Sequence, residues 1–136
     1  MFSSLDISTS GLVAQRVRMD TISANIANAN TTRDAQGRPN PYQRRFAVFA
    51  PGDGHGGNGV HVRTVGQDNR EGRLVLDPGH PDTIESGPLA GYVRMPNVDL
   101  ATEMVNAVEA SRSYEANITA MQITKQMYAA DLRILA

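Results

Sequence analysis

The chain has 136 residues, enough for one domain, and it is 40% hydrophobic but only 5% aromatic with no tryptophan, so a dense central core is not expected. Its formal net charge of −1 gives no overall attraction to nucleic acid or to an anionic membrane surface. The absence of cysteine excludes disulfides and thiolate metal sites, and no apolar run approaches the roughly 20 residues that span a bilayer.

The charge is distributed unevenly along the chain. Residues 1–75 carry nine arginines against six carboxylates, and residues 76–136 carry four basic residues against eight carboxylates. This asymmetry is compatible with attraction between the two halves, within one chain or between stacked subunits. Ordinary scatter of surface charge would produce the same pattern.

The first predicted element is a helix over about residues 4–30. Ser3 and Asp6 have the Ser-x-x-Asp spacing of a capping box. Apolar residues then recur every seven positions, in a stripe that is too narrow for the face of a globular surface helix and is typical of a coiled-coil seam. The stripe consists of Leu5, Leu12, Met19 and Ile26, with Ile22 and Ala29 on a second line.

The end of this helix is unusually rich in asparagine and threonine. Asn25, Asn28 and Asn30 are followed directly by Thr31 and Thr32. These side chains compete with the backbone for hydrogen bonds and are poor in helix interiors. We therefore expect a frayed helix end, in which the side chains satisfy free carbonyls or bond to a neighbour.

Turns and short strands are predicted between the two ends of the chain. Alternation of apolar and polar residues, bounded by glycine and proline, indicates strands at 45–49, 59–65, 73–76 and 91–95. The loop that precedes the first strand is rich in arginine, a residue that forms forked contacts with carboxylates. We expect inter-subunit charge contacts from Arg33, Arg38, Arg44 and Arg45.

The last predicted element is a helix over residues 99–135, capped by Asn97 or Asp99. It contains neither glycine nor proline, and it would be about 55 Å long at 1.5 Å per residue. Its seam residues recur at steps of three and four, with one step of seven from Ser111 to Ile118. They are Met104, Val108, Ser111, Ile118, Met121, Lys125, Tyr128, Leu132 and Leu135.

These elements predict an α+β fold in which long N- and C-terminal helices pair as a coiled coil around a small β-rich middle insert. Residues 1–32 and 98–136 would form one core domain, and residues 33–97 the middle segment. Since two narrow stripes and four short strands cannot bury each other fully, much apolar surface should be buried only between subunits, with poorly ordered ends before assembly. The predicted interface residues are Leu5, Leu12, Met19, Ile22, Ile26, Met104, Val108, Ile118, Met121, Tyr128, Leu132 and Leu135.

Signals for catalysis or ligand binding are weak. Residues 52–57 fit G-x-G-x-x-G, but the next predicted element is a strand, whereas a dinucleotide site needs a helix there. The spacing of His55, His61 and His80 matches no common zinc pattern. We therefore predict no catalytic residues, no metal and no cofactor.

Several segments resemble the axial family of bacterial flagellar rod and hook proteins. Residues 23–32, SANIANANTT, are similar to the family's N-terminal motif, in which we single out Asn25, Asn28, Asn30 and Thr31. Other segments resemble the signatures of a short proximal-rod subunit within the family. They are residues 77–82 (DPGHPD), 91–99 (GYVRMPNVD), 103–105 (EMV) and 110–117 (ASRSYEAN). The resemblance covers nearly the whole chain, and residues 33–58 depart from it most.

The resemblance implies a non-enzymatic structural subunit of the rod, the drive shaft of the basal body, with its terminal helices around the central export channel. It implies partners among the other proximal and distal rod subunits and the basal-body adaptor at the export gate and MS ring, with no nucleic acid and no membrane span. Export would follow the flagellar type III route to the periplasm without a cleaved signal. This route agrees with residues 1–4, which lack a positive start and precede no apolar run of signal length.

Two alternatives remain open at this point. Another short rod protein would share the N-terminal motif, and a small helical adaptor would use the same helices in a fixed 1:1 complex. The arginine-rich loop also has alternatives, namely contact with anionic cell-wall polymer or simple solvation, and we favour contact with a neighbouring subunit.

Overall fold

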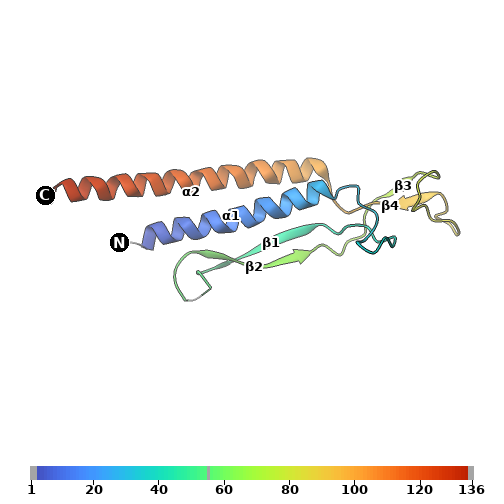
Figure 1. The fold of residues 1–136 in the computed structure, drawn as a ribbon, viewed down its shortest axis with the longest axis horizontal. Coiled ribbons are helices and arrows are strands. Elements are labelled where there is room, and N and C mark those ends of the chain that lie inside the picture. Colours follow the sequence, from blue (N-terminus) through green and yellow to red (C-terminus); the bar gives the residue numbers. More distant parts are fainter. Residues whose placement is uncertain (1–2, 55, 135–136) are drawn as a thin grey trace.

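The computed structural model describes residues 3–54 and 56–134. It confirms the predicted α+β class, with a long helix at each end and a β-rich segment between them (Figure 1). All four predicted strands are present, with bounds shifted by at most two residues. The elements in chain order are α1 (Ser3–Ala27), β1 (Arg45–Pro51), β2 (Val60–Gln67), β3 (Leu74–Leu76), β4 (Tyr92–Arg94) and α2 (Leu100–Ile134).

The two helices lie side by side and run in opposite directions, which gives the molecule an elongated shape (Figure 1). Near the start of α1, the hydroxyl of Ser4 lies 3.2 Å from that of Tyr128 near the end of α2. The helices approach closely at Gly11, where an added Cβ would lie only 3.0 Å from Oδ1 of Asn117. Glycine inside this helix, which costs about 1 kcal/mol relative to alanine, therefore has a packing reason.

The strands form two separate antiparallel ribbons. β1 and β2 pair with a bulge between Val48 and Phe49, and this ribbon packs on α1, so that α1 lies between α2 and the ribbon (Figure 1). The hydroxyl of Ser10 accepts a hydrogen bond from the Val60 amide at 3.1 Å, which ties α1 to β2. β3 and β4 form a smaller ribbon at the far end of the molecule, beyond the point where α1 ends and α2 begins.

The helix ends follow the capping expectations in part. α1 ends at Ala27, and the Ala24 carbonyl accepts both from the Asn28 amide at 3.1 Å and from Nδ2 of Asn28 at 2.9 Å, so this side chain adds a second hydrogen bond to a carbonyl that is not free. Asp99 caps α2, since its Oδ1 accepts from the Ala101 amide at 3.1 Å. The cap predicted at Ser3 involves a side chain outside the described part of the structure.

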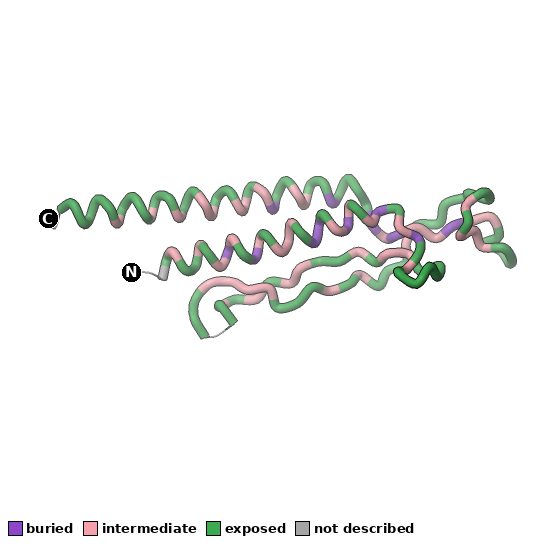
Figure 2. The backbone as a smooth tube through the Cα atoms, in the orientation of Figure 1, coloured by how far each residue is buried: buried purple, intermediate pink, exposed green. Residues whose placement is uncertain are grey.

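The interior of the described chain is thin, as Figure 2 shows by the scarcity of buried positions. Its buried apolar residues are mostly small, and they lie along α1, in β4 and at the start of α2. They are Ala14, Ile22, Ala29, Val93, Val98 and Ala110. The largest fully buried side chain is charged, that of Glu103.

Candidate assembly surfaces and the joint between the helices

The faces of α1 and α2 that meet are built mainly from small and polar side chains. On α2 the line that faces α1 runs through Glu103, Ala110 and Asn117, which are seven residues apart and therefore share one face. Opposite them on α1 lie Gly11 and Asn25. At these positions of close approach the two helices therefore meet through small and polar side chains.

The large apolar side chains of the first turns of α2 point away from α1. The exposed fractions of Met104, Val105 and Val108 are 57%, 67% and 55%, and with Glu109 and Arg112 these residues line a shallow hollow. Figure 2 shows the exposed class predominating along the outer side of this helix. Ile123, Met127 and Ile134 continue the exposed apolar surface toward its end.

The predicted interface residues fall into three groups. Ile22 is buried within the chain. Seven are half-buried, and the Tyr128 hydroxyl among them lies 3.2 Å from that of Ser4 on α1: Leu5, Leu12, Met19, Ile26, Ile118, Met121 and Tyr128. Others are exposed: Met104, Val108 and Leu132. Leu135 lies outside the described residues, and the contact of each residue with another subunit stays a prediction.

A buried polar joint connects the end of α1 to the start of α2. Asn25 and Glu103 are both 0% exposed, and Nδ2 of Asn25 donates to Oε2 of Glu103 at 3.0 Å. Nε of Arg44 donates to Oε1 of the same carboxylate at 2.6 Å. A buried carboxylate is tolerated only when its charge is compensated, and Arg44 provides that compensation.

The side chain of Asn25 uses its full hydrogen-bonding capacity. Besides its bond to Glu103, its Nδ2 donates to the Arg45 carbonyl at 2.8 Å. Its Oδ1 accepts from the Arg45 amide at 2.8 Å and from the Tyr42 hydroxyl at 3.1 Å. Burial raises the pKa of the Tyr42 phenol above its ordinary value, which keeps this hydroxyl a donor.

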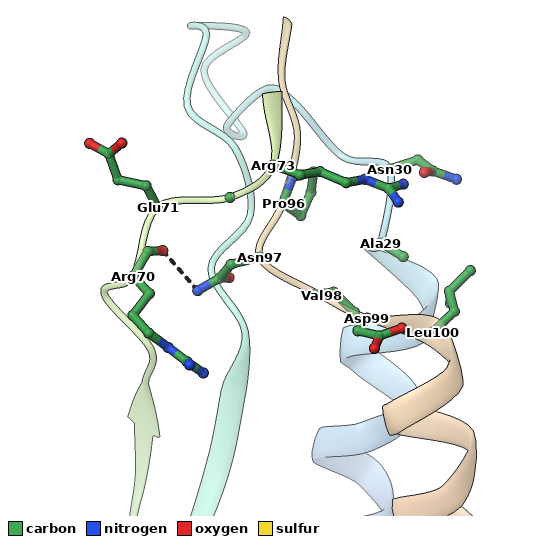
Figure 3. Close-up of a pocket in the computed structure, with 11 residues that line it drawn as sticks. Ala29, Asn30, Arg70, Glu71, Arg73, Pro96, Asn97, Val98, Asp99 and Leu100 are labelled. Atoms are coloured by element: carbon green, nitrogen blue, oxygen red, sulfur yellow. Dashed lines mark hydrogen bonds between the residues drawn. The ribbon is translucent and has the colours of Figure 1, made fainter. Parts of the chain in front are cut away.

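Asn97 has a similar role on the other side of the joint. Its Oδ1 accepts from the Arg44 amide at 2.7 Å, and its Nδ2 donates to the Asp68 carbonyl at 2.8 Å. Nδ2 also donates to the Arg70 carbonyl at 3.0 Å, the bond drawn in Figure 3. The sequence predicted Asn97 or Asp99 as the helix cap, and the structure gives the cap to Asp99 alone. Asn97 instead holds the segment before β1 against the segment before β3.

Figure 3 also shows a hollow beside this joint, between the end of α1, the segment before β3 and the turn into α2. Arg73 extends across it toward Asn30, while Glu71 points away from it. No group of three or more His, Asp or Glu residues in the described chain is arranged to hold a metal ion. The predicted hairpin loop at residues 52–57 connects β1 and β2, although His55 lies outside the described residues.

Asp82, in the connection between β3 and β4, ties that ribbon to the segment that follows α1. Its carboxylate accepts from the Thr32 hydroxyl at 2.7 Å and from Nε of Arg33 at 2.7 Å, and its side chain is only 4% exposed. The Thr32 hydrogen bond, together with Arg33, holds the pKa of this carboxyl below its ordinary value.

The four predicted contact arginines all have partners within the chain. Their inter-subunit role stays a prediction, since a partner within the chain does not occupy all five N–H donors of a guanidinium. The partners are Asp82 for Arg33, Asp34 for Arg38, Glu103 for Arg44 and the ring of Tyr42, at 5.7 Å, for Arg45.

The sequence singled out Asn25, but it did not reveal that Glu103, Asn97 and Tyr42 belong to the same hydrogen-bond network. The available signal was the position of Glu103, a charged residue one step before the apolar position Met104 in a helix otherwise read as a seam.

No described helix is long and apolar enough to cross a membrane.

Each of the two helices lies in a segment that matches a known protein family. The family described as "Flagella basal body rod protein" matches residues 5–33, which include α1 and the asparagine-rich turn. The family described as "Flagellar basal body rod FlgEFG protein C-terminal" matches residues 89–134, which include β4 and α2. The two matched regions therefore meet at the joint formed by Asn25 and Glu103.

Full-length relatives agree with these matches. The chain is 42% identical to "Flagellar basal-body rod protein FlgC" of Borreliella burgdorferi, over 99% of this chain and 97% of that protein. It is 43% identical to FlgC of Bacillus subtilis, over 98% and 97%, and 37% identical to FlgC of Aquifex aeolicus, over 94% and 92%. These names agree with the central motifs, which pointed away from another short rod protein such as FlgB. The chain belongs to the FlgC family of flagellar basal-body rod proteins, and it is a structural subunit of the rod.

Proposed function

We propose that this rod subunit is part of the proximal rod and is held there by the exposed apolar face of α2, which packs against neighbouring rod subunits. The observation that carries the proposal is the exposure of Met104, Val105 and Val108 beside a polar contact between α1 and α2. Burying one such side chain fully contributes about 1.5–3 kcal/mol, so each residue that a neighbour covers favours the contact and helps to offset the entropy lost on association.

A stripe of half-buried apolar residues on α1 supplies the second part of the proposed interface. Leu5, Leu12, Met19 and Ile26 recur every seven residues on α1 and remain only half-covered within the chain. A narrow stripe with this period fits the groove of another helix by knobs-into-holes packing. Because Arg33, Arg38, Arg44 and Arg45 already have partners within the chain, we assign them a secondary role at the same interfaces.

Such packing suits a drive shaft that transmits torque. Many interlocked side chains distribute the load, and close-packed interiors resist deformation. We place the helix pair next to the central export channel and the β-rich segment outside it, in contact with other subunits of the proximal and distal rod and with the basal-body adaptor near the MS ring. In this proposal the chain reaches the periplasm through the flagellar type III route, with its N-terminus uncleaved.

The test replaces Val108 in the full-length chain, expressed in a flagellated host that lacks its own copy. Val108→Asp should abolish swimming in soft agar, because the interface would bury a carboxylate without a counter-charge. Helix content by circular dichroism should stay unchanged, because Val108 is 55% exposed within the chain. Val108→Leu, the matched control, keeps an apolar side chain and should swim.

Normal swimming of the Val108→Asp strain would contradict the assignment of this face to an interface. Recovery of the unmodified chain in a fixed 1:1 complex, and its absence from purified basal bodies, would favour the helical adaptor instead.

A further inference from the structure

The contact between α1 and α2 contains little that fixes how far one helix is displaced along the other. In a coiled coil, a large side chain on one helix inserts between four residues of the other helix and so fixes the register. Small residues such as Gly11 and Ala110 do not provide such a side chain. The ion pair between Arg18 and Glu109, at 3.1 Å, is exposed on the glutamate side, and exposed pairs contribute about 0–1 kcal/mol. Apolar packing and surface charge alone therefore specify the register weakly.

A displacement of one heptad would give a second acceptable pairing. In the observed register Gly11 lies opposite Asn117, and Asn25 lies opposite Glu103. Moving α2 by seven residues would place Ala110 opposite Gly11, with Glu103 near Arg18, so that small residues still meet and an opposite charge is still available. The displacement would be about 10 Å, at 1.5 Å per residue.

The buried joint distinguishes these two registers. The amide and carbonyl of Arg45 are both held by Asn25, on α1. The amide of the preceding residue, Arg44, is held by Asn97, and its guanidinium by Glu103, on the α2 side. Because residues 44 and 45 are adjacent, the chain has no slack between these two attachments, and a 10 Å displacement would break one of them.

We propose that Asn25 and Glu103 are positioning residues that fix the antiparallel register of the two terminal helices, with residues 44 and 45 as the staple between them. In the displaced register Glu103 would lose its hydrogen bonds from Arg44 and Asn25. Arg18 would supply a nearby charge but not this buried, hydrogen-bonded arrangement, and breaking such a buried pair is strongly destabilising. A single buried polar residue has the same effect in coiled coils, where it specifies register at some cost in stability.

The register matters for assembly because it sets the spacing between the apolar stripe of α1 and the exposed face of α2. A neighbouring subunit that contacts both Leu12 and Val108 would meet them about 10 Å out of place after a one-heptad displacement. Fixing the register is a property of the single chain, so its test does not depend on the interfaces proposed above.

The absence of cysteine allows a direct test in the full-length chain. The in-register pair is Gly11→Cys with Asn117→Cys, and the off-register pair is Gly11→Cys with Ala110→Cys. Disulfides need Cα atoms about 4.4–6.8 Å apart, so each pair reports one register. The yield of each disulfide is measured after mild oxidation of the purified chain, by gel mobility with and without reductant.

The joint is disrupted by the double substitution Asn25→Leu with Glu103→Leu, and Arg18→Gln is the matched control on the same contact. We expect the ratio of off-register to in-register disulfide to rise by more than about tenfold in the joint variant and to stay unchanged in the control, because only the joint penalises displacement strongly. Circular dichroism checks that the variant remains helical. Retained helix content shows that the change in disulfide ratio comes from a changed register and not from loss of folding.

If the double variant loses its helix content, Glu103→Gln replaces it, since this variant keeps the shape and removes only the charge. A measurable rise in the off-register product of Glu103→Gln would then support the proposal. In-register disulfide alone in a helical joint variant, or equal yields of both disulfides with the joint intact, would overturn it.

Discussion

Single residues decide how closely the segments around the joint approach one another, and Gly72 is the clearest case. A Cβ added there would overlap the carbonyl oxygen of Met95 and lie 2.9 Å from the carbonyl carbon of Pro96. Both obstacles are backbone, and the Met95 amide is itself held by the Arg73 carbonyl at 2.9 Å. The turn that leads into α2 therefore has no free space at this position.

We predict that Gly72→Ala lowers the free energy of unfolding by about 1–3 kcal/mol, the usual cost of overpacking. Chemical denaturation followed by circular dichroism measures the change. Gly79→Ala is the matched control, because a Cβ there would meet only Oδ1 of Asp77, at an ordinary 3.7 Å. Equal stability of Gly72→Ala and Gly79→Ala would contradict this account of the turn.

Single residues also differ in whether their contacts could be predicted from the sequence. Asn28 bonds, as the sequence predicts, to a carbonyl at the helix end only four residues away, although that carbonyl also accepts from the Asn28 amide and is not free. The joint could not be predicted, because Glu103 lies 78 residues from Asn25 and only the fold brings the two together. Local propensity identifies an unusual residue, whereas a distant partner depends on the path of the chain.

At the scale of elements, the strands were predictable because alternation and turn residues are local signals, and all four are present. The face of α2 that contacts α1 was less predictable. The predicted seam ran through Met104 and Ser111, whereas the contact with α1 runs one position earlier, through Glu103 and Ala110. Apolar periodicity does not distinguish a contact within one chain from a contact with another chain.

The attachment of the β3–β4 ribbon to α1 should depend on pH, because Asp82 accepts hydrogen bonds as a carboxylate. Its pKa is lowered on folding, so the carboxylate adds stability above the unfolded pKa of about 3.9 and loses it as the pH falls through the folded value. Asp82→Asn should therefore be less stable than the unmodified chain at pH 7. The difference should shrink steadily below about pH 4.

Urea unfolding at several pH values measures this difference. Glu85→Gln is the control for the removed charge, because Glu85 is an exposed carboxylate in the same connection between β3 and β4. A gap between Asp82→Asn and the unmodified chain that is as large at pH 3 as at pH 7 would show that ionisation of Asp82 has no part in the attachment.

At the scale of the whole molecule, the chain is long, thinly packed and incompletely covered. The buried apolar residues of the described chain are few and mostly small, while many large apolar side chains remain exposed, among them Val13 on α1 and Met127 on α2. A chain with so little apolar burial gains limited stability on folding alone. The shape therefore fits a subunit that completes its core by contact with its neighbours.

The measurement that tests this account most directly is thiol labelling of Val105→Cys, in the purified chain and in basal bodies isolated from a swimming strain. Val105 is 67% exposed, and the natural chain has no cysteine that would interfere. Ala110→Cys, at a position that is 0% exposed, is the protected reference in both samples. The account predicts that a maleimide labels Cys at position 105 readily in the purified chain and that assembly protects it. Equal labelling in the two samples would contradict the claim that neighbouring subunits cover the outer face of α2.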